Sequence, residues 1–178
     1  QNSAANKEGL AGQQCGIPMN QMSAYVQDVL DLIEWANGNP ASSKWAKMRA
    51  DAGHPAPFHL KMIGIGNEDL ITTAFEERYL MICKAVKAKY PDIEVIGTVG
   101  PFHYSSADYI EGWKVAKANK SVIDAVDEHY YESPGWFLHN QNYYDQYDRK
   151  GPKVYLGEYA SRSRTVESAL AEAIHLCN

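Results

Sequence analysis

Two glutamates stand at matching points of this 178-residue sequence. Glu68 follows the apolar stretch 59–65, and Glu158 follows the apolar stretch 153–156. A carboxyl group at the end of a buried strand is costly unless it is paired or used. Two such groups that face each other could cleave a glycosidic bond. One would protonate the leaving oxygen, while the other would attack the anomeric carbon or activate a water molecule.

The residues around these glutamates also have ordinary structural interpretations. A single glutamate at a strand end is more often a helix-cap partner or a surface residue. Asn67 could simply support a left-handed turn, and His129 could be a core histidine with satisfied hydrogen bonds. Several aromatic residues fall in segments expected to be loops. They could stack on sugar rings or pack in the core and at its rim: Tyr104, Tyr130, Tyr131, Trp136 and Tyr143.

The elements that would position these residues alternate between strands and helices. Apolar runs predict strands at 59–65, 93–98, 122–127 and 153–156. Helical spacing of apolar residues predicts helices at about 21–36, 43–50, 107–118, 143–147 and from 165 onward. Another helix should begin at a capping box formed by Thr73 and Glu76 and bury the Cys83 thiol. Asn37-Gly38 should end the first helix as a left-handed cap.

This alternation predicts an α/β fold with a parallel sheet. Successive strands start roughly 30 residues apart, which matches one unit of a (β/α)8 TIM barrel of ~250 residues. A doubly wound sheet would alternate in the same way, but no glycine-rich phosphate loop follows any strand. We therefore expect residues 1–178 to be one partial barrel domain that covers about strands 4 to 7. The two glutamates would then lie at the same C-terminal edge, three units apart.

Composition and spacing argue against several other classes. A hydrophobic content of 45% and a charged content of 22% are typical of globular proteins. The net charge of −5 disfavours nucleic acid as a partner. No apolar run reaches roughly 18 residues, so no membrane span is expected. The histidines and three cysteines lack metal-site spacing, and no Gly-x-Ser-x-Gly motif is present. The cellular compartment stays open.

Three motifs together resemble the α-L-arabinofuranosidases of glycoside hydrolase family 51. They are Gly64-Ile65-Gly66-Asn67-Glu68, Asp127-Glu128-His129-Tyr130-Tyr131 and Tyr155-Leu156-Gly157-Glu158-Tyr159-Ala160. Further similar segments are Gly16-Ile17-Pro18-Met19, Glu34-Trp35-Ala36-Asn37-Gly38 and the stretch 51–57. An Asn-Glu pair alone is shared by a large clan of retaining barrel enzymes, whereas this combination is far more specific.

The resemblance implies a role for each matching residue. Glu68 would be the general acid/base and Glu158 the nucleophile of a retaining hydrolase. Asn67 would bind the sugar 2-hydroxyl. His129 and Tyr131 match the family's His-x-Tyr motif, in which the tyrosine contacts the nucleophile and the sugar. Trp136 is a looser candidate for the rim of the substrate site.

The resemblance further implies release of terminal α-L-arabinofuranosyl groups from arabinose-containing oligosaccharides or polysaccharides. It implies no cofactor and no metal, and it implies a homo-oligomer for the full-length protein. Barrel strands 1–3 and 8 and the family's β-sandwich domain have no counterpart in these residues. Two alternatives stay open: a retaining enzyme of the same clan that acts on another sugar, and a sugar-binding fragment without activity.

Overall fold

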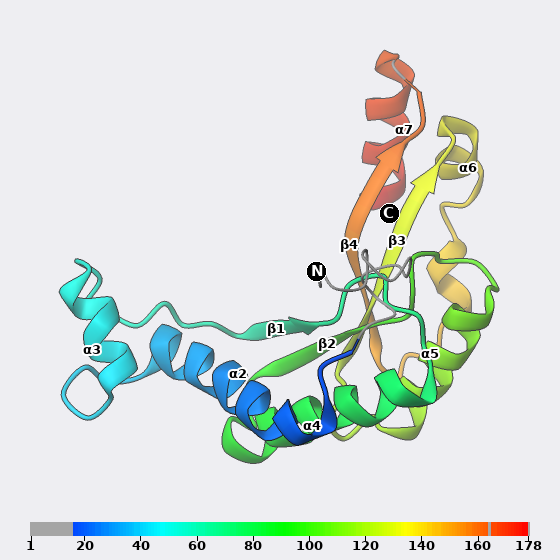
Figure 1. Ribbon diagram of the computed structural model, residues 1–178. Helices are drawn as coiled ribbons and strands as arrows, with labels where there is room; N and C mark the ends of the chain where they lie inside the picture. The colour runs from blue at the N-terminus through cyan, green and yellow to red at the C-terminus, as the bar shows by residue number, and fades with distance from the viewer. Residues whose placement is uncertain (1–15, 164, 178) are drawn as a thin grey trace, which may run out of the picture.

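The centre of the fold is a parallel four-stranded sheet in a computed structural model that describes residues 16–163 and 165–177. The strands lie side by side in chain order, and every neighbouring pair is parallel. Their bounds are β1 (Met62–Ile65), β2 (Glu94–Thr98), β3 (Ala125–Glu132) and β4 (Lys153–Ser161). The predicted parallel α/β arrangement is confirmed. Figure 1 shows that β3 and β4 rise steeply from the plane of β1 and β2, so the sheet curls.

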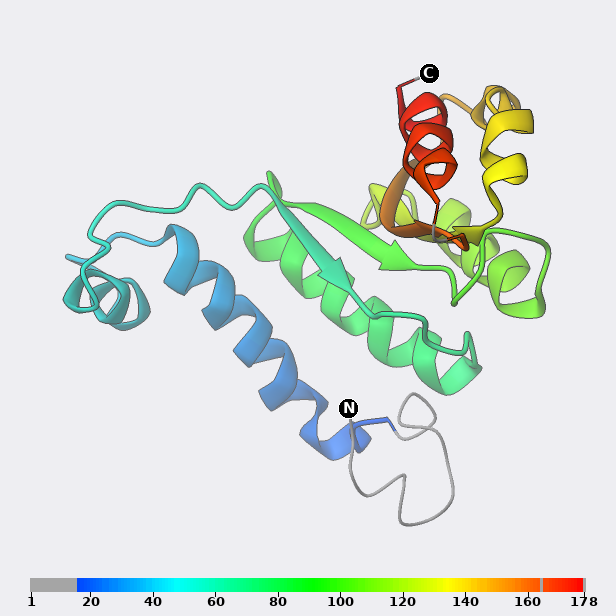
Figure 2. The same cartoon turned by 90° about the horizontal axis from the view of Figure 1, so that it is seen from above.

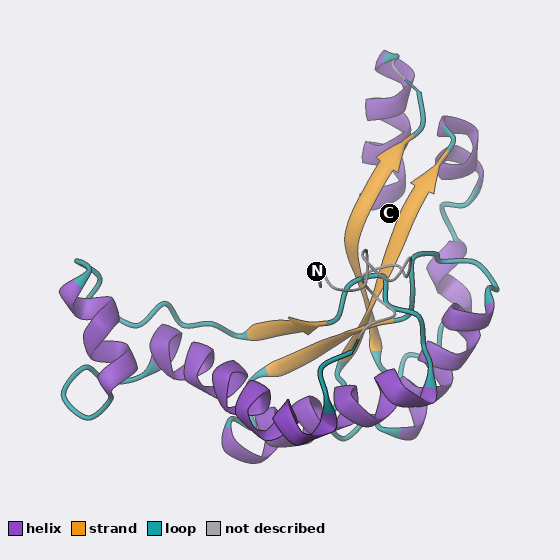
Figure 3. Ribbon diagram, in the orientation of Figure 1, coloured by secondary structure: helices purple, strands orange, loops and turns teal. Residues whose placement is uncertain are grey.

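Helices cover one face of this sheet and leave the other face open in the described part of the chain (Figures 1 and 3). The helices of the described chain are η2 (Met19–Gln21), α2 (Met22–Asn37), α3 (Lys44–Asp51), α4 (Thr73–Lys89), α5 (Ala107–Ala118), α6 (Pro134–His139), η3 (Tyr143–Gln146) and α7 (Val166–Leu176). Among them α3 packs on α2 and lies away from the sheet. Seen from above, α2 lies alongside α4 (Figure 2). None of the helices described is long and apolar enough to cross a membrane.

The main core lies between the sheet and helices α2, α4 and α5. On α4 the buried residues recur at helical spacing, so one face of the helix packs against β1 and β2. Cys83 is completely buried there, which confirms the predicted core thiol. A smaller cluster of Tyr130, Phe137 and Ala171 joins β3 to α6 and α7. The helices therefore pack on the outer face of the sheet, and the described residues leave the opposite, inner face uncovered.

Several local predictions were wrong in detail. The cap of α4 is Thr72 rather than Thr73, because the Thr72 hydroxyl accepts the N–H of Phe75. Gly38 has φ −67°, so α2 ends in extended backbone and not in a left-handed cap. The helix expected at 143–147 is the short 3-10 helix η3, preceded by α6. Strands β3 and β4 extend to residues 132 and 161, beyond the predicted ends at 127 and 156.

Arg49 joins α3 to the end of α2 and is completely buried. Its five N–H groups all donate to backbone carbonyl oxygens, at 2.6–3.2 Å, and its partners are Trp35, Ala36, Gly38, His54 and Pro55. Three of these carbonyls belong to the C-terminal end of α2, where unpaired carbonyl groups and the helix dipole favour a cation. The guanidinium group therefore fixes the α2–α3 corner.

Replacing Arg49 by methionine is expected to lower the free energy of unfolding by about 3 kcal/mol, because it leaves buried carbonyl groups without donors. Lys47 is a matched control, since it lies on the same helix and pairs with Asp51 in solvent, with a 65% exposed side chain. Lys47→Ala should change stability by less than about 1 kcal/mol. Denaturation of the full-length protein would measure both. Equal small effects would show that the Arg49 contacts contribute little.

Candidate active site

The inner face of β3 carries three polar residues at alternate positions, Asp127, His129 and Tyr131. His129 is 2% exposed, and both of its ring nitrogens face carboxylates. Nδ1 lies 2.8 Å from Glu68 Oε1, and Nε2 lies 3.2 Å from Asp127 Oδ2. The Tyr131 hydroxyl donates to Glu158 Oε2 at 2.6 Å. This strand therefore connects the two glutamates predicted to act together.

Glu68 reaches the cluster from the loop that follows β1. The backbone turns at Gly66, φ 86°, where a β-carbon would lie 2.7 Å from both Asp69 Oδ2 and Thr98 Cγ2. The Asn67 N–H donates to Asp69 Oδ2 at 2.8 Å, and Glu68 itself has φ 54°. A non-glycine residue in this left-handed region costs about 1–3 kcal/mol, and such strain concentrates at functional sites.

Glu158 lies within β4, next to an irregularity in its pairing with β3. Glu128 pairs with Leu156 and His129 pairs with Glu158, so Gly157 is an extra residue between them. Such a bulge changes the direction of the following side chain. Here it places Glu158 on the same face as His129, with 3.7 Å between Glu158 Oε2 and His129 Nδ1.

The cluster gives His129 a positive charge near neutral pH. Burial alone lowers the pKa of His129, but hydrogen bonds to Asp127 and Glu68 outweigh it and raise the pKa to about 9. The imidazolium therefore donates to one carboxylate on each side. The hydrogen bond from Tyr131 to Glu158 raises the pKa of the tyrosine, and the negative charges of Glu158 and Glu68 raise it further.

Glu68, His129 and Glu158 each offer one ligand atom, and these atoms lie within 4.8 Å of one another. In the described part of the chain this is the one group of His, Cys, Asp and Glu side chains compact enough to hold a metal ion. A histidine nitrogen that binds a metal ion must carry no proton, whereas the carboxylates beside both ring nitrogens raise the pKa of His129 to about 9. The arrangement fits a proton-sharing cluster better than a metal centre.

The structure brings four of the five predicted site residues into direct contact: Glu68, His129, Tyr131 and Glu158. Asn67 is adjacent to Glu68 in the loop, and its side chain is exposed. The left-handed residues of this loop are Gly66 and Glu68, so the alternative use of Asn67 as the left-handed position is wrong. Asp127 is the cluster member that the sequence did not single out.

The outer face of β3 carries a third glutamate with a different environment. Glu128 is completely buried and accepts hydrogen bonds from Trp113 Nε1 at 2.8 Å, from the Tyr147 hydroxyl at 3.0 Å and from the Tyr130 hydroxyl. Burial raises the pKa of Glu128, and these hydrogen bonds oppose that rise. Because donors surround its carboxyl group, Glu128 belongs to the packing of β3 against α5 and η3.

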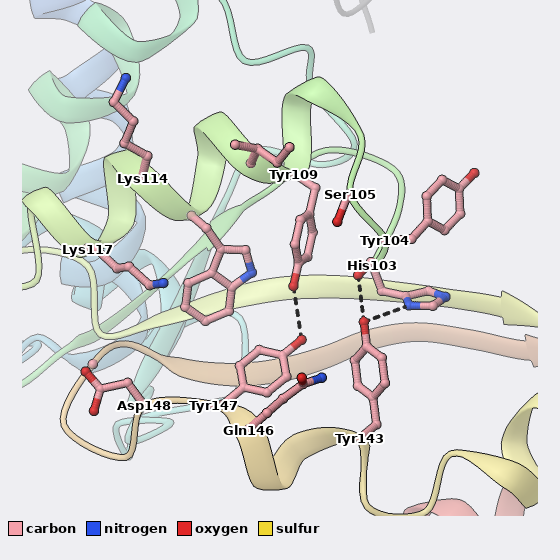
Figure 4. A pocket seen from close by; sticks show the side chains of 13 residues that line it. His103, Tyr104, Ser105, Tyr109, Lys114, Lys117, Tyr143, Gln146, Tyr147 and Asp148 are labelled. Atoms are coloured by element: carbon pink, nitrogen blue, oxygen red, sulfur yellow. Dashed lines mark hydrogen bonds between the residues drawn. The ribbon is translucent and has the colours of Figure 1, made fainter.

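A cavity of about 770 Å³ opens beside this network, between α5 and η3 (Figure 4). Tyr109 and Tyr147 point toward each other across it and join their hydroxyl groups at 3.1 Å. Tyr143 donates its hydroxyl to the backbone oxygen of His103. The residues lining this cavity come from α5, η3 and the adjoining loops, and Glu68 and Glu158 are not among them.

The aromatic residues considered for sugar stacking divide between the two faces. Tyr131 reaches Glu158. Tyr130 is completely buried, and Trp136 packs in α6 against the rings of Tyr130, Tyr143 and His175. These contacts favour packing over substrate binding for Trp136. Residues 128–132 were expected in a loop but lie in β3, where successive side chains point to opposite faces.

Comparison with known proteins matches residues 4–149 to the α-L-arabinofuranosidase 1 domain. The chain is 46% identical over 152 residues to an extracellular exo-α-L-arabinofuranosidase of Streptomyces chartreusis, covering 85% of this chain and 18% of that protein. It is 33% identical over 157 residues to α-L-arabinofuranosidase 2 of Arabidopsis thaliana, covering 85% of this chain and 21% of that protein.

A solved structure of the arabinose-bound α-L-arabinofuranosidase MgGH51 superimposes with a TM-score of 0.72 at 30% identity. The match covers 90% of this chain and 26% of the solved chain, so the chain spans about a fifth to a quarter of these relatives. The matched domain range includes Glu68, His129 and Tyr131 and ends before Glu158. The chain therefore belongs to the α-L-arabinofuranosidases of glycoside hydrolase family 51, as part of their catalytic domain.

Proposed function

We propose that residues 1–178 form about strands 4 to 7 of a (β/α)8 catalytic barrel. The chain-order parallel sheet and the helices on its outer face support this proposal. Neither β1 nor β4 has a second neighbouring strand among the described residues. Closure of the sheet by further strands of the full-length protein would pair both edges and cover the exposed inner face.

Glu68 is proposed as the general acid/base and Glu158 as the nucleophile of a retaining glycosidase. The observation that carries this proposal is their proximity: a carboxylate oxygen of Glu68 lies within 4.8 Å of a carboxylate oxygen of Glu158. Retaining glycosidases hold their two carboxyl groups about 5–5.5 Å apart, whereas inverting enzymes leave roughly 6.5–9.5 Å for a water molecule. The short separation in this cluster favours the retaining arrangement.

In the first step Glu158 attacks the anomeric carbon while Glu68 protonates the departing oxygen, which forms a glycosyl ester on Glu158. In the second step Glu68 removes a proton from water, which displaces the sugar from Glu158. Tyr131 donates to the Glu158 carboxylate and holds it in place. His129 holds Glu68 in the same way. Asn67, next to Glu68, is proposed to bind the sugar 2-hydroxyl.

The proposed substrate is a terminal α-L-arabinofuranosyl group on an arabinose-containing oligosaccharide or polysaccharide. The names of the relatives support this choice, and one solved relative contains arabinose. The glutamate pair itself does not select the sugar, because many retaining enzymes share it.

Hydrolysis of a panel of aryl glycosides by the full-length protein tests this function. We expect cleavage of the α-L-arabinofuranoside at a kcat/KM at least about 100-fold above that of the β-xyloside or β-glucoside. The first sugar released, followed by NMR, should keep the α configuration. Preference for another glycoside would make the protein a same-clan enzyme with a different substrate. Sugar binding without any hydrolysis would contradict catalytic activity.

A further inference from the structure

Asp127 joins the two halves of the catalytic cluster from within β3. Its Oδ1 accepts the N–H of Gly157 at 2.9 Å, and its Oδ2 lies 3.2 Å from His129 Nε2. The carboxylate therefore contacts the bulge of β4 through one oxygen and the histidine ring through the other. Its side chain is 20% exposed, so solvent screens these contacts only partly.

The bulge residue Gly157 packs directly against this carboxylate. A β-carbon at Gly157 would lie 2.2 Å from Asp127 Oδ1, so a side chain at position 157 and the Asp127 contact exclude each other. The extra residue in β4 places Glu158 opposite His129. The contact between Asp127 and Gly157 therefore lies directly beside the residue whose face the bulge determines.

The histidine is held by two carboxylates on opposite sides of its ring. Glu68 accepts a hydrogen bond from Nδ1, and Asp127 accepts one from Nε2, so the ring plane is fixed and both nitrogens carry protons. A histidine whose second nitrogen has a carboxylate partner is locked in orientation and protonation state. Without Asp127 the Nε2 side would have no such partner, and the ring could turn away from Glu68.

We propose that Asp127 is a positioning residue that aims the Glu158 carboxylate through the Gly157 bulge and orients His129 against Glu68. The inference rests on the proposed function of Glu68 and Glu158. In this proposal Asp127 contacts the Gly157 N–H and the His129 ring, and it does not touch the substrate. Its effect should therefore appear in the rate of the chemical step and not in substrate affinity.

Asp124 offers a matched control just before the same strand. Its carboxylate also accepts a backbone N–H from a neighbouring strand, Val95 at 2.8 Å, and it pairs with the Lys87 amino group at 2.8 Å. It precedes β3, at the edge of the sheet opposite to Glu68 and Glu158. Asp124→Asn and Asp127→Asn thus make comparable changes to the sheet, and only the second lies in the cluster.

The test compares full-length wild-type protein with Asp127→Asn, Gly157→Ala, Asp124→Asn and Glu158→Ala. Asp127→Asn keeps an oxygen for Gly157 but cannot pair with the imidazolium, whereas Gly157→Ala disturbs the bulge and keeps every carboxylate. We expect Asp127→Asn and Gly157→Ala each to lower kcat on an aryl α-L-arabinofuranoside about 100-fold, since small misplacements of reacting groups have effects of that size. KM should change by less than roughly threefold.

Two further measurements separate positioning from simple destabilisation. The ¹⁵N signals of His129 should titrate at lower pH in Asp127→Asn than in wild type, and Asp124→Asn should leave that titration unchanged. Thermal midpoints of Asp127→Asn and Asp124→Asn should be similar, while Asp124→Asn keeps kcat within roughly twofold.

Normal kcat in Asp127→Asn, with Glu158→Ala inactive, would overturn the positioning role and leave the proposed function standing. A much larger loss of stability in Asp127→Asn than in Asp124→Asn, or failure of Asp127→Asn alone to fold, would make Asp127 a structural residue and also overturn it. Ordinary turnover by Glu158→Ala would refute the proposed function, and the inference with it.

Discussion

Replacing Glu158 by alanine in the full-length protein is expected to lower kcat on aryl α-L-arabinofuranosides by about 10⁴-fold or more, because no covalent intermediate can form. The space left beside His129 and Tyr131 can admit a small anion. Added azide should therefore restore turnover and release the arabinosyl azide of inverted configuration. Product configuration by NMR and initial rates measure both effects.

Glu132 is the matched control for this variant. It ends the same strand, β3, but its carboxylate pairs with His103 at 2.9 Å, away from the inner-face cluster. Glu132→Gln keeps a hydrogen-bonding group and should leave kcat within roughly threefold. A Glu158→Ala enzyme with normal rates, or with no response to azide, would remove Glu158 from the nucleophile's role.

Glu68→Ala should have an effect that depends on the leaving group. With a natural arabinoside the loss of the general acid should lower kcat by about 10²–10⁴-fold. With a dinitrophenyl arabinofuranoside the departing oxygen needs no proton, so formation of the glycosyl-enzyme should stay fast and its hydrolysis should become limiting. Azide should then yield the arabinosyl azide of retained configuration. Rapid-mixing kinetics would show the corresponding burst of dinitrophenol.

Glu77 gives the control for this second variant, because it lies exposed on α4, directly after the Glu68 loop. Glu77→Ala should behave as wild type with both substrates. An equal loss for good and poor leaving groups in Glu68→Ala would contradict a proton-donating role. It would indicate instead that Glu68 supports His129 or the loop.

The glutamate pair could be predicted from the sequence because regularly alternating strands and helices predict a parallel sheet, in which the C-terminal ends of the strands share one edge. Helix 107–118 was predicted with its observed bounds, since Ser106 caps it and apolar residues recur along it. Four strands at regular spacing then place residues after β1 and within β4 at one edge. The resemblance to family 51 assigned His129 and Tyr131, and the structure joins both to the glutamates.

The extent of β3 and the bulge of β4 could not be read in the same way. Residues 127–132 are polar or aromatic on both faces, so they show no alternation of apolar and polar residues. Each finds its partners only after folding: His129 meets Glu68 inside, and Glu128 meets Trp113 outside. The Gly157 bulge depends on Asp127, 30 residues earlier in the chain. Such long-range contacts leave no local pattern.

The most direct test of the retaining pair is to locate the covalent sugar. The full-length Glu68→Ala protein, mixed with dinitrophenyl α-L-arabinofuranoside, should accumulate a glycosyl-enzyme, because the second step lacks its base. Mass spectrometry of the proteolysed protein should find one arabinosyl group on the peptide that contains Glu158, attached to that residue. Attachment to a different residue, or release of an inverted product with no labelled peptide, would contradict Glu158 as the nucleophile.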